Sequence, residues 1–128
     1  MSIKLLIIED NEQNYYMMRF LLEKKGFKVI GAENGRLGVE KALSEKPDAI
    51  LLDIQLPEMD GYAVAAELKK HAEIDDVPIV AVTSYAMVGD RENIMAAGAT
   101  GYIEKPINPD TFVDEISRFV QDKKPKSE

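Results

Sequence analysis

Five short apolar runs alternate with helix-like patterns along the chain, and this alternation restricts the fold more than any other feature. Three of the runs are almost entirely apolar, which is typical of parallel strands that helices cover on both faces. Strands and helices that alternate through short loops form right-handed crossovers, so we predict an α/β, doubly wound parallel sheet. The predicted strands are Lys4–Ile8, Lys28–Ala32, Ala49–Leu52, Ile79–Val82 and Gly101–Ile103.

Capping residues mark five helices between and after these strands. Asparagine and aspartate accept backbone hydrogen bonds at helix N-termini, and glycine often follows helix ends. The last helix is predicted to carry an apolar stripe of Phe112, Ile116, Phe119 and Val120. The first predicted helix runs from about Glu12 to Lys25, and the second follows Asn34 and ends before Pro47. The third follows Asp60, the fourth ends at Gly98, and the last opens with Asn108, Pro109 and Asp110.

The composition fits one intracellular domain. The chain has 128 residues, of which we assign 1–122 to the domain and 123–128 to a polar tail. The net charge of −7 disfavours direct binding of nucleic acid, and the absence of cysteine excludes disulfides and cysteine-based sites. No apolar run approaches the roughly 18 residues of a membrane helix, and the first ten residues are predicted to hold a strand and not a signal peptide. We therefore expect a cytoplasmic location.

Polar side chains follow several of the predicted strands. In doubly wound folds, ligands bind outside the carboxyl ends of the strands. If the first and third strands are neighbours, about 4.8 Å apart, the acids at their ends converge. The residues at the strand ends are Glu9 and Asp10, then Asp53, then Thr83 and Ser84, then Glu104, Lys105 and Pro106.

Converging carboxylates repel one another. At about 4 Å and an effective dielectric constant near 20, one like-charge pair costs about 4 kcal/mol. Either proton uptake or a divalent cation relieves this cost, and Mg²⁺ binds few carboxylates while it keeps several waters. Lys105 would add a positive charge and Thr83 a hydroxyl group. Each of these residues alone is more often a helix cap or a solvated side chain. The prediction of a site depends on the acids, the hydroxyl group and the lysine all following strands at the same end of the sheet.

Four motifs resemble the receiver domains of bacterial two-component response regulators. They occur in the family's order and spacing, and the resemblance covers roughly Ile3 to Val120. The resemblance implies a flavodoxin-like sheet of strand order 2-1-3-4-5 with five helices. The motifs are IIEDN at Ile7–Asn11, ILLDIQLPEMDGY at Ile50–Tyr62, VAVTSYA at Val80–Ala86 and GYIEKPI at Gly101–Ile107.

The resemblance also implies a metal-dependent phosphorylation site. Asp53 is then the nucleophile that accepts a phosphoryl group. Glu9 and Asp10 form the acidic pair that holds Mg²⁺ together with Asp53, and Gln55 lends its backbone carbonyl group. The pair is Glu-Asp where the family usually has Asp-Asp, and the longer glutamate can still reach the ion directly or through water.

Three further residues receive roles from the resemblance. Lys105 steadies the phosphoryl charge, and its bond to Pro106 is expected to be cis. Thr83 donates a hydrogen bond to the attached phosphoryl group, and Tyr102 is the switch aromatic that turns inward when Thr83 moves. Ser84 follows where the family often has a smaller residue, and its hydroxyl lies near the phosphoryl group.

The implied function is that of a signalling phosphoacceptor, which is not an enzyme acting on a separate substrate. The chain has a single histidine, His71, which is predicted at a polar helix end far from the strand ends. The phosphohistidine must therefore come from a partner, either a sensor histidine kinase or a histidine phosphotransfer protein. The domain catalyses its own phosphorylation and dephosphorylation. Output is expected as protein contact through the fourth helix, the fifth strand and the last helix, without direct contact to nucleic acid or membrane. Passage of the phosphoryl group to a phosphotransfer domain is the alternative.

Two side chains are expected to influence hydrolysis of the acyl phosphate. Gln55 and Tyr85 stand two residues beyond Asp53 and Thr83, where the family's positions flank the path of the attacking water. We predict that Tyr85→Ala shortens the phosphoryl lifetime. An interface role for Tyr85 is the alternative, and exposure of the neighbouring Met87 and Val88 would favour it.

Rival functions fit the sequence less well. A phosphatase of the haloacid dehalogenase type needs a second aspartate two residues after the nucleophile, where this chain has Gln55. A receiver-like interaction module that no longer accepts phosphate is disfavoured because all the chemical residues are present. Nucleotide or flavin binding lacks the glycine pattern, and an EF-hand lacks its loop glycine, because Tyr15 stands at that position.

Overall fold

The computed structural model describes residues 3–56, 60–74, 76–84 and 88–120. The predicted polar tail, residues 123–128, lies outside the described residues. In the described part of the chain, no helix combines the length and apolar character that a membrane span needs. The elements are β1 (Lys4–Ile8), α1 (Glu12–Lys24), β2 (Lys28–Ala32), α2 (Gly35–Glu45), β3 (Ala49–Asp53), α3 (Gly61–Lys69), a short 3₁₀ helix η1 (Ala72–Ile74), β4 (Ile79–Thr83), α4 (Val88–Ala96), β5 (Gly101–Glu104) and α5 (Phe112–Val120).

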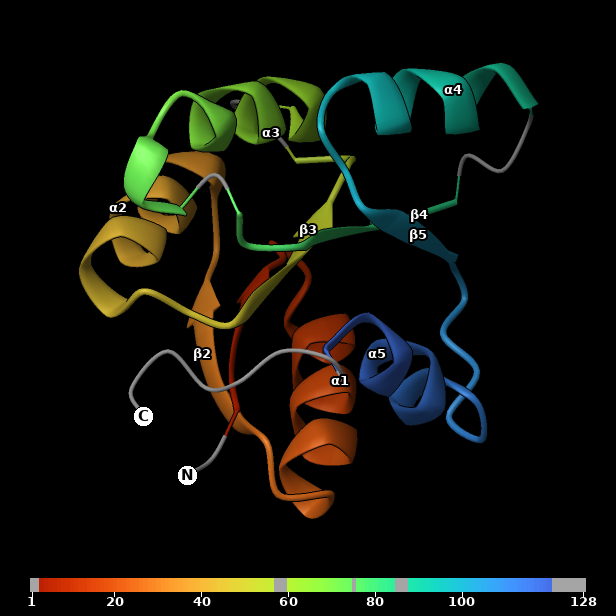
Figure 1. Ribbon diagram of the computed structural model, residues 1–128. Helices are drawn as coiled ribbons and strands as arrows, with labels where there is room; N and C mark the ends of the chain where they lie inside the picture. Colours follow the sequence, from red (N-terminus) through yellow and green to blue (C-terminus); the bar gives the residue numbers. More distant parts are fainter. Residues whose placement is uncertain (1–2, 57–59, 75, 85–87, 121–128) are drawn as a thin grey trace.

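The five strands form one parallel sheet of order β2-β1-β3-β4-β5. This confirms the predicted flavodoxin-like topology. Helices α1 and α5 cover one face of the sheet, and α2, α3 and α4 cover the other (Figure 1). Alternate residues of β1 enter the two layers: Leu5 and Ile7 pack with α1 and α5, whereas Leu6 and Ile8 pack with α2 and α3. The apolar strands are therefore buried on both faces, as their sequences predict.

Caps fix the helix limits. The Asn34 side chain accepts a hydrogen bond of 2.9 Å from the Leu37 N–H, and the Asp60 side chain accepts one of 2.9 Å from the Ala63 N–H. Both residues are therefore confirmed as N-caps. Helix α2 ends at Glu45, because the C-cap Lys46 has a left-handed backbone with φ 48° and Pro47 follows. Gly26 has φ 94° just beyond α1, a conformation that suits glycine because it has no side chain to clash.

The observed limits differ from the predicted ones at three strand ends, at the start of the last helix and at the end of α4, which is Ala96 and not Gly98. Asp53, Thr83 and Glu104 are the last residues of β3, β4 and β5 and not the first residues beyond them. The ladder continues further because the Ile54 N–H donates to the Val82 carbonyl, at 3.2 Å. The last helix begins at Phe112, because the Asn108 side chain accepts from the Asp110 N–H and so closes a turn before the helix.

Candidate functional site

Two adjacent strands bring the acidic residues together. Strands β1 and β3 are neighbours, with Ile8 paired to Leu52, so Glu9 and Asp53 leave the sheet side by side. Carboxylate oxygens of Glu9, Asp10 and Asp53 lie within 4.8 Å of one another. Glu9 and Asp53 are buried, at 3% and 2% exposure, whereas Asp10 is exposed. The convergence that the sequence predicted at the carboxyl ends of the strands is present.

Lys105 contacts two of the three acids. Its Nζ is 3.3 Å from Glu9 Oε1 and 3.3 Å from Asp53 Oδ1. The residue follows β5 and precedes Pro106, and the bond between them is cis, as predicted. One ammonium group thus faces two buried carboxylates, and the cluster of three acids keeps a negative charge in excess.

Glu9 carries the electrostatic strain of the cluster. Its Oε2 accepts a hydrogen bond from the Asn11 N–H at 3.3 Å, while Oε1 is buried and accepts no hydrogen bond from the described residues. The pKa of Glu9 rises to about 7, first because of burial, then because of a hydrogen bond and a charge from Asp53, and the charge of Lys105 opposes the rise. A proton or a cation at Oε1 would relieve this strain.

The donor set fits Mg²⁺. Three carboxylates supply oxygen atoms, and one of these carboxylates, Asp10, is exposed to solvent. Glu9 Oε1 is buried and accepts no hydrogen bond from the described residues, with the Lys105 ammonium group 3.3 Å away. Magnesium binds such oxygen ligands through one or two carboxylates and retains several waters. Glu9, Asp10 and Asp53 are therefore the side chains that could hold the ion.

Asp53 is connected to the neighbouring loops. Its Oδ1 accepts a hydrogen bond from the Gln55 N–H at 2.9 Å. The exposed Gln55 side chain in turn accepts, through Oε1, a hydrogen bond from Ser84 Oγ at 2.9 Å. Sequence patterns gave Gln55 and Ser84 separate roles and did not predict this contact, because no local signal fixes the distance between two loops.

Thr83 and Tyr102 lie on the neighbouring strands. Thr83 ends β4, next to β3, and is fully buried. Tyr102 is half-buried on β5, and the Arg91 guanidinium group lies over its ring, 5.0 Å from the centroid. Arg91 also approaches Glu104, with 3.8 Å between Nη2 and Oε1. Sequence analysis missed Arg91, since the side of α4 that faces β5 depends on packing.

His71 lies away from these residues. It follows α3, which returns from the carboxyl edge of the sheet toward the opposite edge, and its Nε2 is 3.4 Å from Glu67 Oε2. This position suits a surface contact with Glu67 rather than chemistry at the acidic cluster. Tyr85 and Met87, which entered the prediction on hydrolysis, lie outside the described residues, as does the side chain of Val88.

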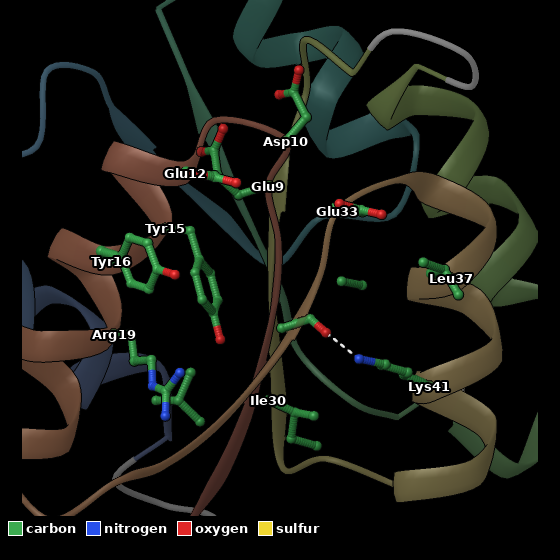
Figure 2. A pocket seen from close by; sticks show the side chains of 13 residues that line it. Glu9, Asp10, Glu12, Tyr15, Tyr16, Arg19, Ile30, Glu33, Leu37 and Lys41 are labelled. Atoms are coloured by element: carbon green, nitrogen blue, oxygen red, sulfur yellow. Dashed lines mark hydrogen bonds between the residues drawn. The ribbon is translucent and has the colours of Figure 1, made fainter.

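A groove of about 560 Å³ borders the acidic cluster beside β2. Figure 2 shows Asp10 and Glu12 at one end of it, Tyr15 along β2, and Lys41 on the α2 side. Lys41 donates to the Gly31 carbonyl group, and the Tyr15 ring occupies the space that a side chain at residue 31 would need. Packing therefore explains Gly31 without a nucleotide-binding loop. The groove reaches the cluster only through Glu9 and Asp10, because Asp53 and Lys105 do not line it.

Comparisons with known proteins agree with this geometry. The profile of the response regulator receiver domain matches residues 5–117. The polar-differentiation response regulator DivK of Brucella anthropi is 40% identical over 122 residues, which cover 95% of this chain and 99% of that protein. The Brucella ovis DivK is 39% identical over the same shares of both chains.

Solved structures share the fold. The chemotaxis protein CheY4 of Vibrio cholerae has a TM-score of 0.89 at 27% identity, covering 93% of this chain and 99% of that chain. The receiver domain of the sensor histidine kinase PA1611 from Pseudomonas aeruginosa has a TM-score of 0.86 at 32% identity, covering 94% and 99%. That structure holds a magnesium ion coordinated in the active site cleft.

Proposed function

The chain belongs to the family of response regulator receiver domains, and from this premise we propose that Asp53 accepts a phosphoryl group from a phosphohistidine of a partner protein. The observation that carries the proposal is the position of Lys105 Nζ, 3.3 Å from both Asp53 and Glu9 within a cluster of three acids. Such a cluster provides a nucleophile, a metal site and a fixed cation together. We take residues 1–122 as the receiver unit.

The proposed metal ligands are the carboxylates of Glu9, Asp10 and Asp53 with the backbone carbonyl group of Gln55. The buried Glu9 Oε1 without a hydrogen bond supports this assignment. When bound, Mg²⁺ supplies positive charge for the phosphoryl oxygens. A cation held by these carboxylates would favour the ionised form of Glu9.

The proposed reaction is a displacement at phosphorus. A carboxylate oxygen of Asp53 forms the new bond to phosphorus while the bond to the histidine nitrogen breaks, and the leaving imidazole takes a proton from solvent. Asp53 needs no general base, because a carboxylate is already the nucleophile. Lys105 orients and neutralises the phosphoryl oxygens, and the Thr83 hydroxyl donates a hydrogen bond to them once they are attached.

Phosphorylation then changes the surface of α4, β5 and α5. A phosphoryl group adds negative charge at Asp53, which attracts Thr83 and Lys105. Tyr102 responds from β5, and the Arg91 group over its ring would have to shift with it. We propose that this surface contacts a downstream protein target, and that it does so without direct binding of nucleic acid or membrane.

The phosphoryl donor is proposed to be a protein, either a sensor histidine kinase or a histidine phosphotransfer protein in the cytoplasm. Tyr16 and Phe20 support a protein donor, since both side chains lie on α1, the helix that begins just after Glu9 and Asp10, and are 60% and 64% exposed. Large exposed apolar groups next to a reactive site favour contact with another protein surface. The relatives that match over nearly their whole length are described as polar-differentiation response regulators.

Stoichiometric labelling tests the proposal. The protein is incubated with acetyl phosphate or phosphoramidate and Mg²⁺, and its intact mass is measured. One phosphoryl group per chain is expected for the parent and none for Asp53→Asn. Labelling of Asp53→Asn to the same extent would reject the assignment. Repeated turnover of a small phosphate ester would instead favour a phosphatase.

A second test concerns the lifetime of the label. Tyr85→Ala is expected to hydrolyse its acyl phosphate faster than the parent, because a bulky side chain two residues beyond Thr83 hinders the attacking water. The measurement is the decay of phosphorylated mass after the donor is removed. Equal lifetimes would reject the role of Tyr85.

A further inference from the structure

One side-chain contact joins the two loops that follow β3 and β4. Ser84 Oγ donates to Gln55 Oε1 at 2.9 Å, and the two residues belong to the loops that follow β4 and β3. Gln55 is also joined to the nucleophile, because its N–H donates to Asp53 Oδ1 at 2.9 Å. Ser84 directly follows the buried Thr83. The contact thus connects both loops beside Asp53.

We propose that the Ser84–Gln55 hydrogen bond is a resting-state latch that phosphorylation of Asp53 opens. In the resting protein the latch engages the hydroxyl proton of Ser84 and ties the two loops together. In the phosphorylated protein Ser84 donates that proton to a phosphoryl oxygen, and Gln55 is released to solvent. The inference rests on the proposed function, since it needs a phosphoryl group on Asp53.

The exchange follows from the number of protons and the strength of the acceptors. A serine hydroxyl has one proton to donate, so Ser84 cannot serve Gln55 and a phosphoryl group together. A charged phosphoryl oxygen is a stronger acceptor than a neutral amide oxygen, with hydrogen bonds about twice as strong. Before phosphorylation, Asp53 Oδ1 already accepts from the Gln55 N–H and contacts Lys105, so Gln55 Oε1 is the acceptor that Ser84 uses.

The latch makes the Gln55 side chain a brake on activation. Opening it costs one hydrogen bond between exposed groups, and the parent must lose this bond before Ser84 can contribute to the active form. Removal of the amide should therefore favour the active form, but only while the Ser84 hydroxyl is present. If the effect of changing Gln55 depends on the Ser84 hydroxyl, the two residues form a latch. Two unrelated surface groups would show no such dependence.

The experiment is a double-mutant cycle on the affinity for beryllofluoride in the presence of Mg²⁺, with the full chain. Beryllofluoride binds as a mimic of the phosphoryl group. Gln55→Leu is expected to bind it about threefold more tightly than the parent, the effect of one modest hydrogen bond. In a Ser84→Ala background the same change should have no effect. Ser84→Thr keeps the hydroxyl and should retain the parent's response to Gln55→Leu.

Two measurements exclude a merely structural effect. The free energy of unfolding is measured for each variant, and Glu45→Ala serves as a control because its contact with Lys4 lies at the opposite edge of the sheet. Glu45→Ala should leave the affinity for beryllofluoride unchanged. If Gln55→Leu acts equally with serine or alanine at residue 84, or does not act at all, the latch is wrong. If the parent neither binds beryllofluoride nor accepts a phosphoryl group, the proposed function fails, and the latch fails with it.

Discussion

Two edges of the sheet bury carboxylates in different ways. At the amino edge, Asp48 is 3% exposed, and its Oδ2 accepts a hydrogen bond from the Lys4 N–H at 2.8 Å. Its own N–H donates to the Lys4 carbonyl group at 2.7 Å, so the pair closes the start of β1 against the start of β3. At the carboxyl edge, Glu9 is equally buried at 3%, yet its Oε1 accepts no hydrogen bond from the described residues.

The difference shows that burial of an acid does not by itself identify a reactive site. Asp48 has a backbone partner that suits its charge, and its burial supports the fold. Glu9 and Asp53 face each other across one lysine, and burial raises the pKa of Glu9 to about 7. The negative charge that remains in excess over Lys105 favours the binding of a metal cation.

The largest expected difference between the two edges concerns phosphorylation. Asp53→Asn should lose the label completely, because the nucleophile is gone. Asp48→Ala should still be labelled, although the buried Lys4 N–H loses its acceptor and the free energy of unfolding falls by about 2 kcal/mol. Intact mass after acetyl phosphate treatment and urea unfolding measure the two effects. A folded Asp48→Ala protein that accepts no phosphoryl group would contradict the comparison.

The two lysines provide the next test. Lys105→Met should lower the free energy of unfolding by about 3 kcal/mol at pH 8, because it leaves two buried carboxylates without a cation. Lys4→Met should cost about 0.5 kcal/mol or less, since the Glu45 carboxylate that it contacts at 3.4 Å is exposed. Urea unfolding of both variants gives the comparison. Equal losses would mean that the carboxyl edge is no more strained than the surface.

Sequence patterns predicted most of the fold and the convergence of Glu9, Asp10 and Asp53 at the carboxyl ends of the strands. The apolar runs predicted all five strands, and the caps Asn34 and Asp60 predicted two helix starts, because these signals are local. The prediction of convergence needed the strand order, which the family resemblance supplied. The equal distances from Lys105 to two acids depend on the packing of β5 against β4, and no sequence pattern reports such distances.

Contacts between loops and helices were the part that sequence could not predict. The stack of Arg91 on Tyr102 and the bond between Ser84 and Gln55 join segments whose separation is set by tertiary packing.

The strain at the carboxyl edge should also appear as a dependence of stability on pH. The pKa of Glu9 is about 7 in the folded protein and near 4.5 when unfolded, so the folded state binds the extra proton between these values. This contribution to stability is complete below pH 4.5 and is lost as the pH rises through 7. In the absence of metal, the free energy of unfolding of the parent should fall by about 2 kcal/mol from pH 5 to pH 8, relative to Glu9→Gln.

The comparison with Glu9→Gln removes the titration of other groups, because these are common to both proteins. Urea unfolding at pH 5 and pH 8 in EDTA provides the measurement. A parallel pH dependence in parent and variant would show that Glu9 is not the strained group.

Magnesium should relieve the repulsion among the acids at the carboxyl edge, with a smaller effect on stability than the pH change. At a free concentration ten times the dissociation constant, binding to the folded protein adds about 1.4 kcal/mol to the free energy of unfolding. Asp48→Ala should gain as much as the parent, because Asp48 lies at the other edge, whereas Asp10→Asn should gain less because it lacks a ligand charge. The gain should be larger at pH 8 than at pH 5, since at low pH the ion must displace the proton of Glu9. Thermal unfolding with Mg²⁺ and with EDTA measures the gain, and an equal gain in Asp10→Asn would show that the ion binds elsewhere.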